Sequence, residues 1–357
     1  MKVAILTSGG DCQGLNPSLR GLAKALYNTS PGVEIYGVAG GYTGLIENNV
    51  RLMRPEEFSG ILRQGGTILG TSRQPFKTMI EEEGRLTEKA EHMLDNYRKG
   101  GYDALVVLGG NGTQKTANLL YKNGVNVVFM PKTIDNDIYG TDWTFGFDSA
   151  VEKACSVLDS VHSTAEAHGR VFVVELMGNK VGWITLHSGI ASGADVILIP
   201  EIPYKTENVL DVVNKRNESG KGFTIIAIAE GAKTVEESSL SRKEQKSLLN
   251  TSGSRLADRL QEMIYSQGTS QDVKLVIPGY FQRGGEPTPF DRIICSRLGA
   301  KAAELLVTGR YGYMVAVSGT EIVAKPLSEV AGVLKEINVD SDIVNQTRNL
   351  GISFGDK

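Results

Sequence analysis

The stretch DALVVLGGNGTQKTANLL, residues 103–120, decides the fold class of this chain. DALVVL is a mostly apolar run, two glycines follow it, and a helical pattern begins soon after them. A strand, a glycine-rich turn and a helix in this order are typical of a parallel α/β sheet. Ligands of such sheets bind at the carboxyl ends of the strands, where this turn lies.

The turn comes close to a phosphate-binding P-loop, which requires G-x-x-x-x-G-K-[ST]. Gly109 and the pair Lys115–Thr116 have this spacing, but Gln114 occupies the position of the second glycine. The turn therefore either binds a phosphate in another way or is an ordinary strand-to-helix turn capped by Asn111 or Thr113.

The same arrangement recurs along the chain. Short β-branched runs that are apolar at nearly every position are typical of strands covered by helices on both faces. Helical patterns lie between several of them, so we predict a doubly wound α/β fold. The predicted strands are VAIL, EIYGVAG, DALVVLGG, NVVFMP, RVFVVELMG, DVILIP, GFTIIAIAEG, VKLVIPG and YMVAVSG, and the clearest helices are NPSLRGLAKALYN, KTANLLYKN and VEKACSVLDSVHSTAEAH.

The composition is that of an ordinary soluble protein, with 41% hydrophobic and 22% charged residues. A net charge of -3 over 357 residues gives no basic surface for nucleic acid. No apolar stretch reaches about 18 residues, so we expect no membrane span. The N-terminal MKVAILTSGGD predicts a first strand, not a signal peptide, and the three widely spaced cysteines indicate reduced thiols in a cytoplasmic protein.

Two further glycine-rich loops have the character of ligand-binding turns. Ser8-Gly9-Gly10-Asp11 follows the first strand, and we expect Asn16 to cap the next helix, with Pro17 at its first position. GGTILGTSR, residues 65–73, ends in an arginine suited to holding a phosphate through two hydrogen bonds. Taken separately, each loop is also explained as a tight turn without a ligand.

PKTIDNDIYGTDWTFGFDSA, residues 131–150, carries two carboxylates on either side of Asn136. In an extended chain Asp135 and Asp137 project to the same side. One carboxylate could then accept a proton from a hydroxyl group while the other orients its partner or assists a metal. The alternative is an Asx-turn, in which these side chains satisfy local backbone groups.

In combination, these segments resemble the phosphofructokinase family over about residues 1–320. The resemblance rests on SGGDCQGLNPSLRG, GGTILGTSR, GGNGT, PKTIDND, FGFDSA, ELMGN, IAEG and GYFQRGG, in this order. It implies two doubly wound Rossmann-like domains with mostly parallel sheets. The donor domain is expected at residues 1–146 plus about 265–320, the sugar-phosphate domain at 147–264, and a C-terminal helical segment at 321–357.

Members of this family transfer a phosphoryl group to the 1-hydroxyl of fructose 6-phosphate, with ATP or, in some members, pyrophosphate as donor. The resemblance makes Asp135 the general base, supported by Thr133 and Asp137, and it gives Arg73 the role of neutralising the phosphoryl group in transit. It also implies Mg²⁺ beside the donor. The implied donor-binding positions are Gly10, Tyr42, Arg73, Gly110, Asn111, Gly112, Thr113 and Lys132.

For the sugar phosphate, Arg170 matches an arginine that reaches in from a neighbouring subunit. A homo-oligomer, either a tetramer or a dimer, is therefore expected. Arg20 and Lys24, which share a helix face, and His162 leave open whether an effector phosphate binds. The implied sugar-phosphate positions are Thr133, Asp135, Arg170, Met177, Gly178, Asn179, Glu230, Lys274, Tyr280 and Arg283.

Several positions depart from the pattern of the family's ATP-dependent members. Asn111 stands where an acid that helps to hold Mg²⁺ is usual, and an amide offers an oxygen without the charge. Asn179 and Lys274 each replace an arginine, and lysine lacks the bidentate fork. Tyr280 replaces a histidine, as in some branches. We hypothesise that Asn111 and Asn179 compensate each other, because one removes a negative charge and the other a positive one.

Two positions bear on the donor. Gly112 stands where the pyrophosphate-dependent branch has an aspartate that blocks the α-phosphate of a nucleotide, so room remains for ATP. Lys132 is typical of the pyrophosphate-dependent branch, but some ATP-using branches also have it. We favour ATP, because steric exclusion is the stronger argument. A pyrophosphate-dependent enzyme, a kinase for another ketose phosphate and a weakly catalytic regulatory or binding member are the alternatives.

Overall fold

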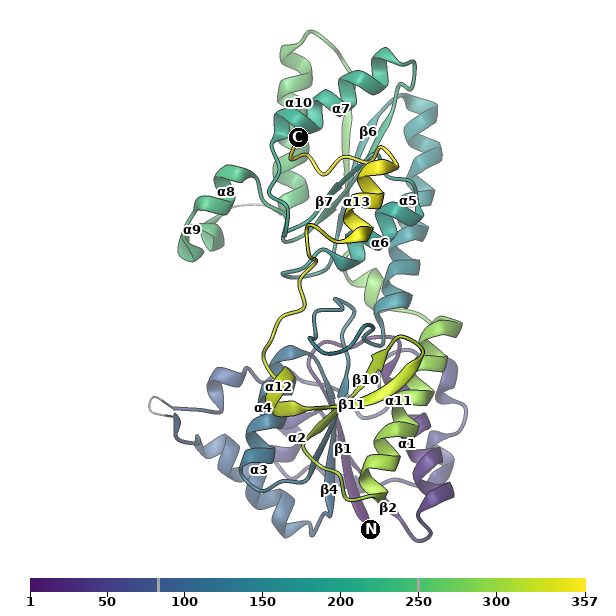
Figure 1. The fold of residues 1–357 in the computed structure, drawn as a ribbon, viewed down its shortest axis with the longest axis vertical. Helices are drawn as coiled ribbons and strands as arrows, with labels where there is room; N and C mark the ends of the chain where they lie inside the picture. Colours follow the sequence, from purple (N-terminus) through teal and green to yellow (C-terminus); the bar gives the residue numbers. More distant parts are fainter. Residues whose placement is uncertain (82–83, 249–250) are drawn as a thin grey trace. The chain divides into compact units, whose positions relative to one another are not determined.

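The computed structural model describes residues 1–81, 84–248 and 251–357, and the chain forms two compact units (Figure 1). Unit 1 consists of residues 1–149 and 283–335, and unit 2 consists of residues 150–282 and 336–357. Each unit contains its own mostly parallel sheet, and helices cover it. The prediction of two doubly wound α/β domains is confirmed.

The sheet of unit 1 has the strand order β11-β10-β5-β4-β1-β2-β3. Its inner strands run parallel, while β3 and β11 pair antiparallel at the two edges. The strands are β1 (Lys2–Ser8), β2 (Glu34–Val38), β3 (Val50–Leu52), β4 (Ala104–Gly109), β5 (Val127–Pro131), β10 (Tyr313–Ser318) and β11 (Glu321–Pro326).

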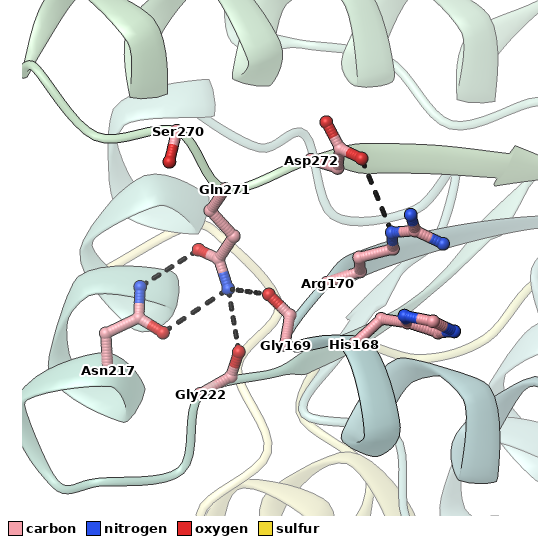
Figure 2. Close-up of a pocket in the computed structure, with 8 residues that line it drawn as sticks. All are labelled: His168, Gly169, Arg170, Asn217, Gly222, Ser270, Gln271 and Asp272. Carbon is pink, nitrogen blue, oxygen red and sulfur yellow. Dashed lines mark hydrogen bonds and ion pairs between the residues drawn. The ribbon is translucent and has the colours of Figure 1, made fainter.

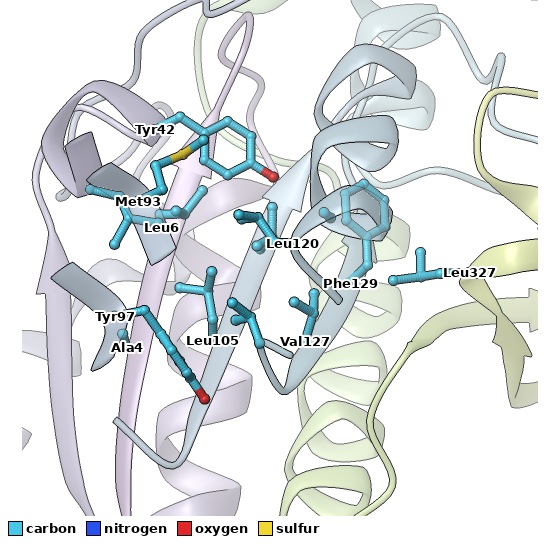
Figure 3. Close-up of a cluster of buried hydrophobic side chains, with 14 of the residues drawn as sticks. Ala4, Leu6, Tyr42, Met93, Tyr97, Leu105, Leu120, Val127, Phe129 and Leu327 are labelled. Atoms are coloured by element: carbon cyan, nitrogen blue, oxygen red, sulfur yellow. The ribbon is translucent and has the colours of Figure 1, made fainter. Parts of the chain in front are cut away.

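Helices lie on both faces of this sheet, which explains why its inner strands are apolar throughout. On one face, α1 (Leu15–Thr29) and α11 (Pro289–Val307) pack closely, because a Cβ on Gly299 would lie only 2.4 Å from the backbone nitrogen of Leu22. On the other face, Met93 and Leu120 pack against Leu6 (Figure 3). That face carries α2 (Tyr42–Ile46), α3 (Glu88–Lys99), α4 (Asn111–Lys122) and α12 (Leu327–Val330).

The sheet of unit 2 has the order β7-β8-β6-β9, and all of its strands are parallel. The strands are β6 (Val171–Leu176), β7 (Val196–Leu198), β8 (Thr224–Ala229) and β9 (Val273–Val276). Apolar side chains of α7 (Thr206–Glu218) and α10 (Ser252–Ser266) form the core with them. The other helices are α5 (Phe147–His168), α6 (Trp183–Ala191), α8 (Val235–Ser239), α9 (Arg242–Ser247) and α13 (Asp342–Asn349).

Two of the expected domain boundaries are wrong. Residues 265–282, expected in the donor domain, belong to unit 2, because β9 pairs with β6. Residues 321–357 do not form a helical segment of their own: β11 completes the sheet of unit 1, and residues 336–357 return to unit 2, where Ser353 pairs with Val196. β11 is only half-buried and carries charges, so a search for apolar runs does not detect it.

The expectations about membrane spans and cysteines can be compared with the structure. In the described part of the chain, no helix is long and apolar enough to cross a membrane. Cys12, Cys155 and Cys295 are free thiols, and Cys12 and Cys295 are buried.

Candidate functional site

The carboxyl ends of β1, β4 and β5 meet at one edge of the unit 1 sheet, because these strands are parallel neighbours. We call this the donor edge. The segments that follow these strands contain residues 9–11, Gly110 with the first turn of α4, and residues 133–137. Three segments that the sequence singled out are therefore brought together within one unit.

A fourth segment, residues 71–74, is fastened to the first of these loops. The backbone N–H of Gly9 donates to the carbonyl of Ser72 at 2.9 Å, and the Thr71 hydroxyl donates to the carbonyl of Gly9 at 2.7 Å. Arg73 is exposed, and within the described residues its guanidinium forms no hydrogen bond or ion pair. Its charge is therefore available to an anionic ligand at the donor edge.

The loop after β4 leads directly into α4. The helix is capped by Gly110, and neither Asn111 nor Thr113 is its N-cap. The N–H of Gln114 donates to the carbonyl of Gly110 at 2.9 Å, so the N–H groups of the three preceding residues have no acceptor within the helix. Such a helix N-terminus favours a phosphate group. A Cβ on Gly112 would meet no atom within 4 Å, so this position faces open space.

Two predicted donor-binding side chains, Tyr42 and Lys132, are buried instead of facing the surface. The Tyr42 hydroxyl donates to the carbonyl of Thr113 at 3.0 Å, and burial raises the pKa of Tyr42 well above its usual value. Figure 3 shows this ring among the core side chains. The Lys132 ammonium donates to the carbonyl of Gly10, and burial lowers the pKa of Lys132. Both side chains support the donor loops from within.

Arg283 lies against the loop that follows β1. Its Nη1 donates to the carbonyl of Asp11 at 3.1 Å, and a Cβ on Gly10 would lie 2.6 Å from the same nitrogen. Any side chain at position 10 would therefore collide with the Arg283 guanidinium, and glycine leaves room for it. The sequence assigned Arg283 to the sugar phosphate, and the structure adds that its charge also lies beside the first donor loop.

The turn of residues 133–137 is not extended, so the extended arrangement in the first of the two alternatives for this segment does not apply. Asn136 has a φ of 52°, in the left-handed region, so the alternation of a strand does not relate Asp135 to Asp137. Their side chains are nearly buried, with exposed fractions of 9% and 7%. A shielded carboxylate at the end of a strand is suited to accepting a proton from a bound hydroxyl group.

Thr133 and Asn136 hold this turn in place. Thr133 Oγ1 accepts a hydrogen bond from the N–H of Asp135 at 3.0 Å. The Asn136 side chain bonds to backbone groups six and eight residues further on: its amide donates to the carbonyl of Asp142 at 3.2 Å, and its Oδ1 accepts from the N–H of Thr144 at 3.0 Å. The turn is thus both locally satisfied and placed at the donor edge.

The prediction that Asn16 caps the first helix is wrong. α1 begins at Leu15 after Gly14, and the Asn16 amide donates to the carbonyls of Gln64 and Gly65 at 3.1 and 3.2 Å. Its Oδ1 accepts from the N–H of Ile68 at 2.8 Å. Asn16 therefore shapes the glycine-rich loop that leads to Arg73, a long-range role that no local sequence signal indicates.

In unit 2, several predicted sugar-phosphate residues lie at the carboxyl edge of the sheet. The carboxylate of Glu230, after β8, accepts from the N–H groups of Gly178 and Asn179 at 3.2 and 2.6 Å, after β6. Met177, Glu230 and Tyr280 line a cavity of about 160 Å³. The structure therefore brings these predicted residues together around a small cavity.

Arg170 and Lys274 lie at the opposite, amino edge of the same sheet. Arg170 precedes β6, and Lys274 pairs with Phe172 near the start of that strand. Both cations contact Asp272, with N–O distances of 3.4 Å for Arg170 and 3.2 Å for Lys274. Figure 2 shows Arg170 and Asp272 beside a cavity of about 430 Å³. Asp272 was not among the residues predicted from the sequence.

The two edges of this sheet are far apart. β6 has six residues, and a strand rises about 3.3 Å per residue, so Arg170 and Met177 are separated by roughly 20 Å along the strand. Arg170 and the Glu230 cavity of the same chain therefore cannot hold one sugar phosphate together.

Mg²⁺ fits this donor edge only as an ion that arrives with a phosphate ligand. Among the described residues, no cluster of three His, Cys, Asp or Glu side chains is placed to hold a metal ion. In phosphoryl-transfer sites, Mg²⁺ binds mainly phosphate oxygens and water, with one or two protein ligands. Asn111 would be the residue to offer such an oxygen, because its nitrogen, not its oxygen, contacts the carbonyl of Val333 at 3.0 Å.

Comparisons with known proteins agree with this geometry. The family model described as phosphofructokinase matches residues 2–306, so the chain belongs to the phosphofructokinase family. It is 49% identical to the ATP-dependent 6-phosphofructokinase of Spirochaeta thermophila, over 99% of this chain and 97% of that protein. It is 44% identical to the ATP-dependent 6-phosphofructokinase 3 of Bacteroides thetaiotaomicron, over 99% of this chain and 100% of that protein.

A solved structure with a similar fold is the Pichia pastoris phosphofructokinase in the T-state. Its TM-score is 0.79 at 31% sequence identity, and the match covers 92% of this chain and 35% of that chain. The likeness extends over both units of the present chain, which supports the division into two α/β domains.

Proposed function

We propose that this chain is an ATP-dependent 6-phosphofructokinase, which transfers the terminal phosphoryl group of ATP to the 1-hydroxyl of fructose 6-phosphate. The open space at Gly112 is the main observation in favour of ATP over pyrophosphate, because a nucleotide needs room beside the first turn of α4. The names of the relatives from S. thermophila and B. thetaiotaomicron support the same donor.

Different residues of the donor edge would take up the proton, stabilise the transferred phosphoryl group and bind the donor phosphates. Asp135 takes the proton of the 1-hydroxyl while that oxygen attacks the terminal phosphorus, and ADP leaves with the electrons of the broken P–O bond. Arg73 offsets the charge on the phosphoryl oxygens in transit. The free N–H groups at the start of α4 hold the donor phosphates. Asn111 would help to hold a Mg²⁺ ion that arrives with the donor, and this ion would supply further positive charge to the phosphates.

Lys132 gives no support to pyrophosphate as the donor. Its side chain is 3% exposed, and its ammonium is held by the carbonyl of Gly10 beneath the first loop. A lysine in this position supports the loop without occupying the space that the rest of a nucleotide needs. The sequence argument for pyrophosphate therefore loses its physical basis in this chain.

Steady-state turnover of fructose 6-phosphate with Mg²⁺ and either ATP or pyrophosphate tests the proposal, with Asp135→Ser as the control. We expect turnover with ATP alone and its loss in the control. Turnover with pyrophosphate alone would contradict the argument from Gly112. No turnover with either donor, together with tight sugar-phosphate binding by calorimetry, would favour the regulatory alternative.

We also propose that the active form is a homo-oligomer. Arg170 and Lys274 lie at the amino edge of the unit 2 sheet, and the cavity of Met177, Glu230 and Tyr280 lies at its carboxyl edge. This separation supports a role of the two cations in binding the sugar phosphate of another copy. Sedimentation velocity should show a dimer or tetramer at assay concentrations, and a fully active monomer would contradict this arrangement.

A further inference from the structure

The segment Gly332–Lys335, which we call the C-terminal clamp, runs across the donor edge of unit 1 after α12. Leu334 forms an antiparallel bridge with Ile138, and the N–H of Lys335 donates to the carbonyl of Asp137 at 2.9 Å. The carbonyl of Val333 accepts from the Asn111 side chain at 3.0 Å. One short segment thus contacts both the catalytic turn and the first turn of the donor helix.

Lys335 makes the most specific contacts of the clamp. Its ammonium donates to Asn136 Oδ1 at 2.9 Å and to the carbonyls of Thr141 and Asp142 at 2.9 and 2.8 Å. An ammonium group has three N–H donors, so it can donate to each of these three acceptors. Lys335 therefore joins the Asn136 side chain to the loop of residues 141–142 through charge-assisted bonds.

These contacts act on the conformation of the catalytic turn. Asn136 has a positive φ, and it lies between the proposed general base Asp135 and Asp137. A non-glycine residue keeps such a conformation only when its surroundings hold it there. The bonds of the Asn136 side chain to Lys335, Asp142 and Thr144 supply this restraint.

The clamp also gives a physical reason for an amide at position 111. The contact with Val333 requires a donor, because a backbone carbonyl can only accept. An aspartate at this position would place a carboxylate oxygen against the carbonyl oxygen, where neither atom can donate. Asn111 can make this contact through its nitrogen and still present its oxygen.

We propose that the C-terminal clamp positions the catalytic turn and the donor helix for phosphoryl transfer, with Lys335 as the positioning residue for Asp135. This inference rests on the proposed function. Lys335 does not touch the reacting atoms, and it acts by holding Asn136. Because misplacement of a catalytic group by about 1 Å can cost roughly 100-fold in rate, loss of the clamp should reduce kcat more than it reduces binding.

The test compares Lys335→Met and Lys335→Arg with Lys325→Met, a control on β11 whose side chain makes no hydrogen bond or ion pair in the described part of the chain. We expect Lys335→Met to lower kcat by about 10- to 100-fold, with the dissociation constants of ATP and fructose 6-phosphate changed by less than about threefold. Lys335→Arg should recover part of kcat, and Lys325→Met should resemble the wild type. Wild-type kcat in a folded Lys335→Met variant would overturn the proposal.

A second measurement does not depend on activity. Hydrogen–deuterium exchange should become faster in residues 136–144 of Lys335→Met, because Thr144 donates its N–H to the Asn136 side chain that Lys335 holds. Unchanged exchange there would overturn the proposal even if Lys335→Met proved unstable in assays. Absence of ATP-dependent turnover in the wild type would instead contradict the proposed function, so the two failures are distinguishable.

Discussion

The donor edge of unit 1 and the predicted sugar-phosphate residues of unit 2 differ in how firmly their own unit holds them. At the donor edge, buried side chains fasten the loops to one another: Tyr42 holds the carbonyl of Thr113, and Lys132 holds that of Gly10. In unit 2, Tyr280 is 78% exposed, and within the described residues the charged groups of Arg170 and Lys274 pair only with Asp272, at the far edge of the sheet. One set of residues is fixed within a single unit, and the other is spread over two edges.

This difference indicates how the two substrates are recognised. A nucleotide can be held by loops that one unit of one chain has already organised. The cations proposed for the sugar phosphate, Arg170 and Lys274, lie about 20 Å from the Glu230 cavity of their own chain, by the rise of about 3.3 Å per residue along β6. A single chain should therefore be able to bind the donor, whereas binding of the acceptor should require the oligomer.

The largest expected effect is that of removing the base at the donor edge. Asp135→Asn should lower kcat by about 1,000-fold, within the range of roughly 10²- to 10⁴-fold for a general base. The calorimetric dissociation constant of ATP should stay within about threefold, because the donor loops are held by other residues. A kcat loss below tenfold would remove Asp135 from its proposed role.

Arg170→Ala should affect the acceptor and leave the donor unchanged. Charge-assisted hydrogen bonds contribute about 1.5–3 kcal/mol, so KM for fructose 6-phosphate should rise about 10- to 100-fold. The matched control is Arg259→Ala, an exposed arginine of unit 2 whose ion pair with Glu262 lies along the surface of α10. An equal change in KM for ATP would contradict the division between donor and acceptor residues.

Gly112→Asp tests the open space beside α4. The carboxylate would stand where a nucleotide phosphate is proposed, and like charges a few ångströms apart repel by several kcal/mol. We expect kcat/KM for ATP to fall at least about tenfold. Because an acid in the first turn of a helix is favourable, the thermal midpoint should not fall. Full ATP activity in this variant would show that the donor does not approach position 112.

The clamp should also leave a signature in the pH dependence of stability. Burial lowers the pKa of Lys335 from 10.5 to about 8, although Asp142 and Asp137 oppose the shift. Between about pH 8 and pH 10.5, Lys335 therefore holds its proton more tightly in the unfolded chain than in the folded chain. The free energy of unfolding should then rise with pH over this range. Relative to Lys335→Met, the free energy of unfolding of the wild type should rise by up to about 1.4 kcal/mol per pH unit above pH ~8.

Thermal or denaturant unfolding of both proteins at pH 7 and pH 9.5 measures this difference. A difference between wild type and variant that falls as the pH rises would contradict the lowered pKa of Lys335.

The smallest expected effect separates two explanations of Asn111. If charge compensation with Asn179 explains it, Asn111→Asp should be rescued when combined with Asn179→Arg. If the clamp explains it, Asn111→Asp should lower kcat a few-fold in either background, because the donor to the Val333 carbonyl is lost. The kcat values of both single variants and the double variant distinguish the two explanations.

Features with a local signal were predictable from the sequence. The apolar runs identified every fully covered strand, and the glycine-rich loops identified the donor edge. β3 and β11 gave no such signal, because edge strands are short or half-exposed. The boundary at β9 was missed because its assignment depends on pairing with β6, which no local pattern reveals.

The supporting residues of the site were not predictable for a related reason. Lys335 acts on Asn136 from 199 positions along the chain, and Val333 acts on Asn111 from 222 positions away. The sequence identified Asn111 as unusual but gave no cause, because the acceptor of its amide lies in a segment without a recognisable motif. Asn16 looked like a helix cap from its neighbours, yet its partners lie in residues 64–68.

Complementation between two impaired variants tests the central claim most directly. Arg170→Ala keeps Asp135, and Asp135→Ser keeps Arg170, so a mixed oligomer can contain a site with both residues. The two variants are dissociated, mixed and reassembled, and turnover is assayed at a fructose 6-phosphate concentration well below the raised KM of Arg170→Ala. The account predicts more ATP-dependent turnover than the sum of the two separate variants. Mixed oligomers that form, as shown by native mass spectrometry, but give no more turnover than this sum would contradict a sugar-phosphate site shared between copies.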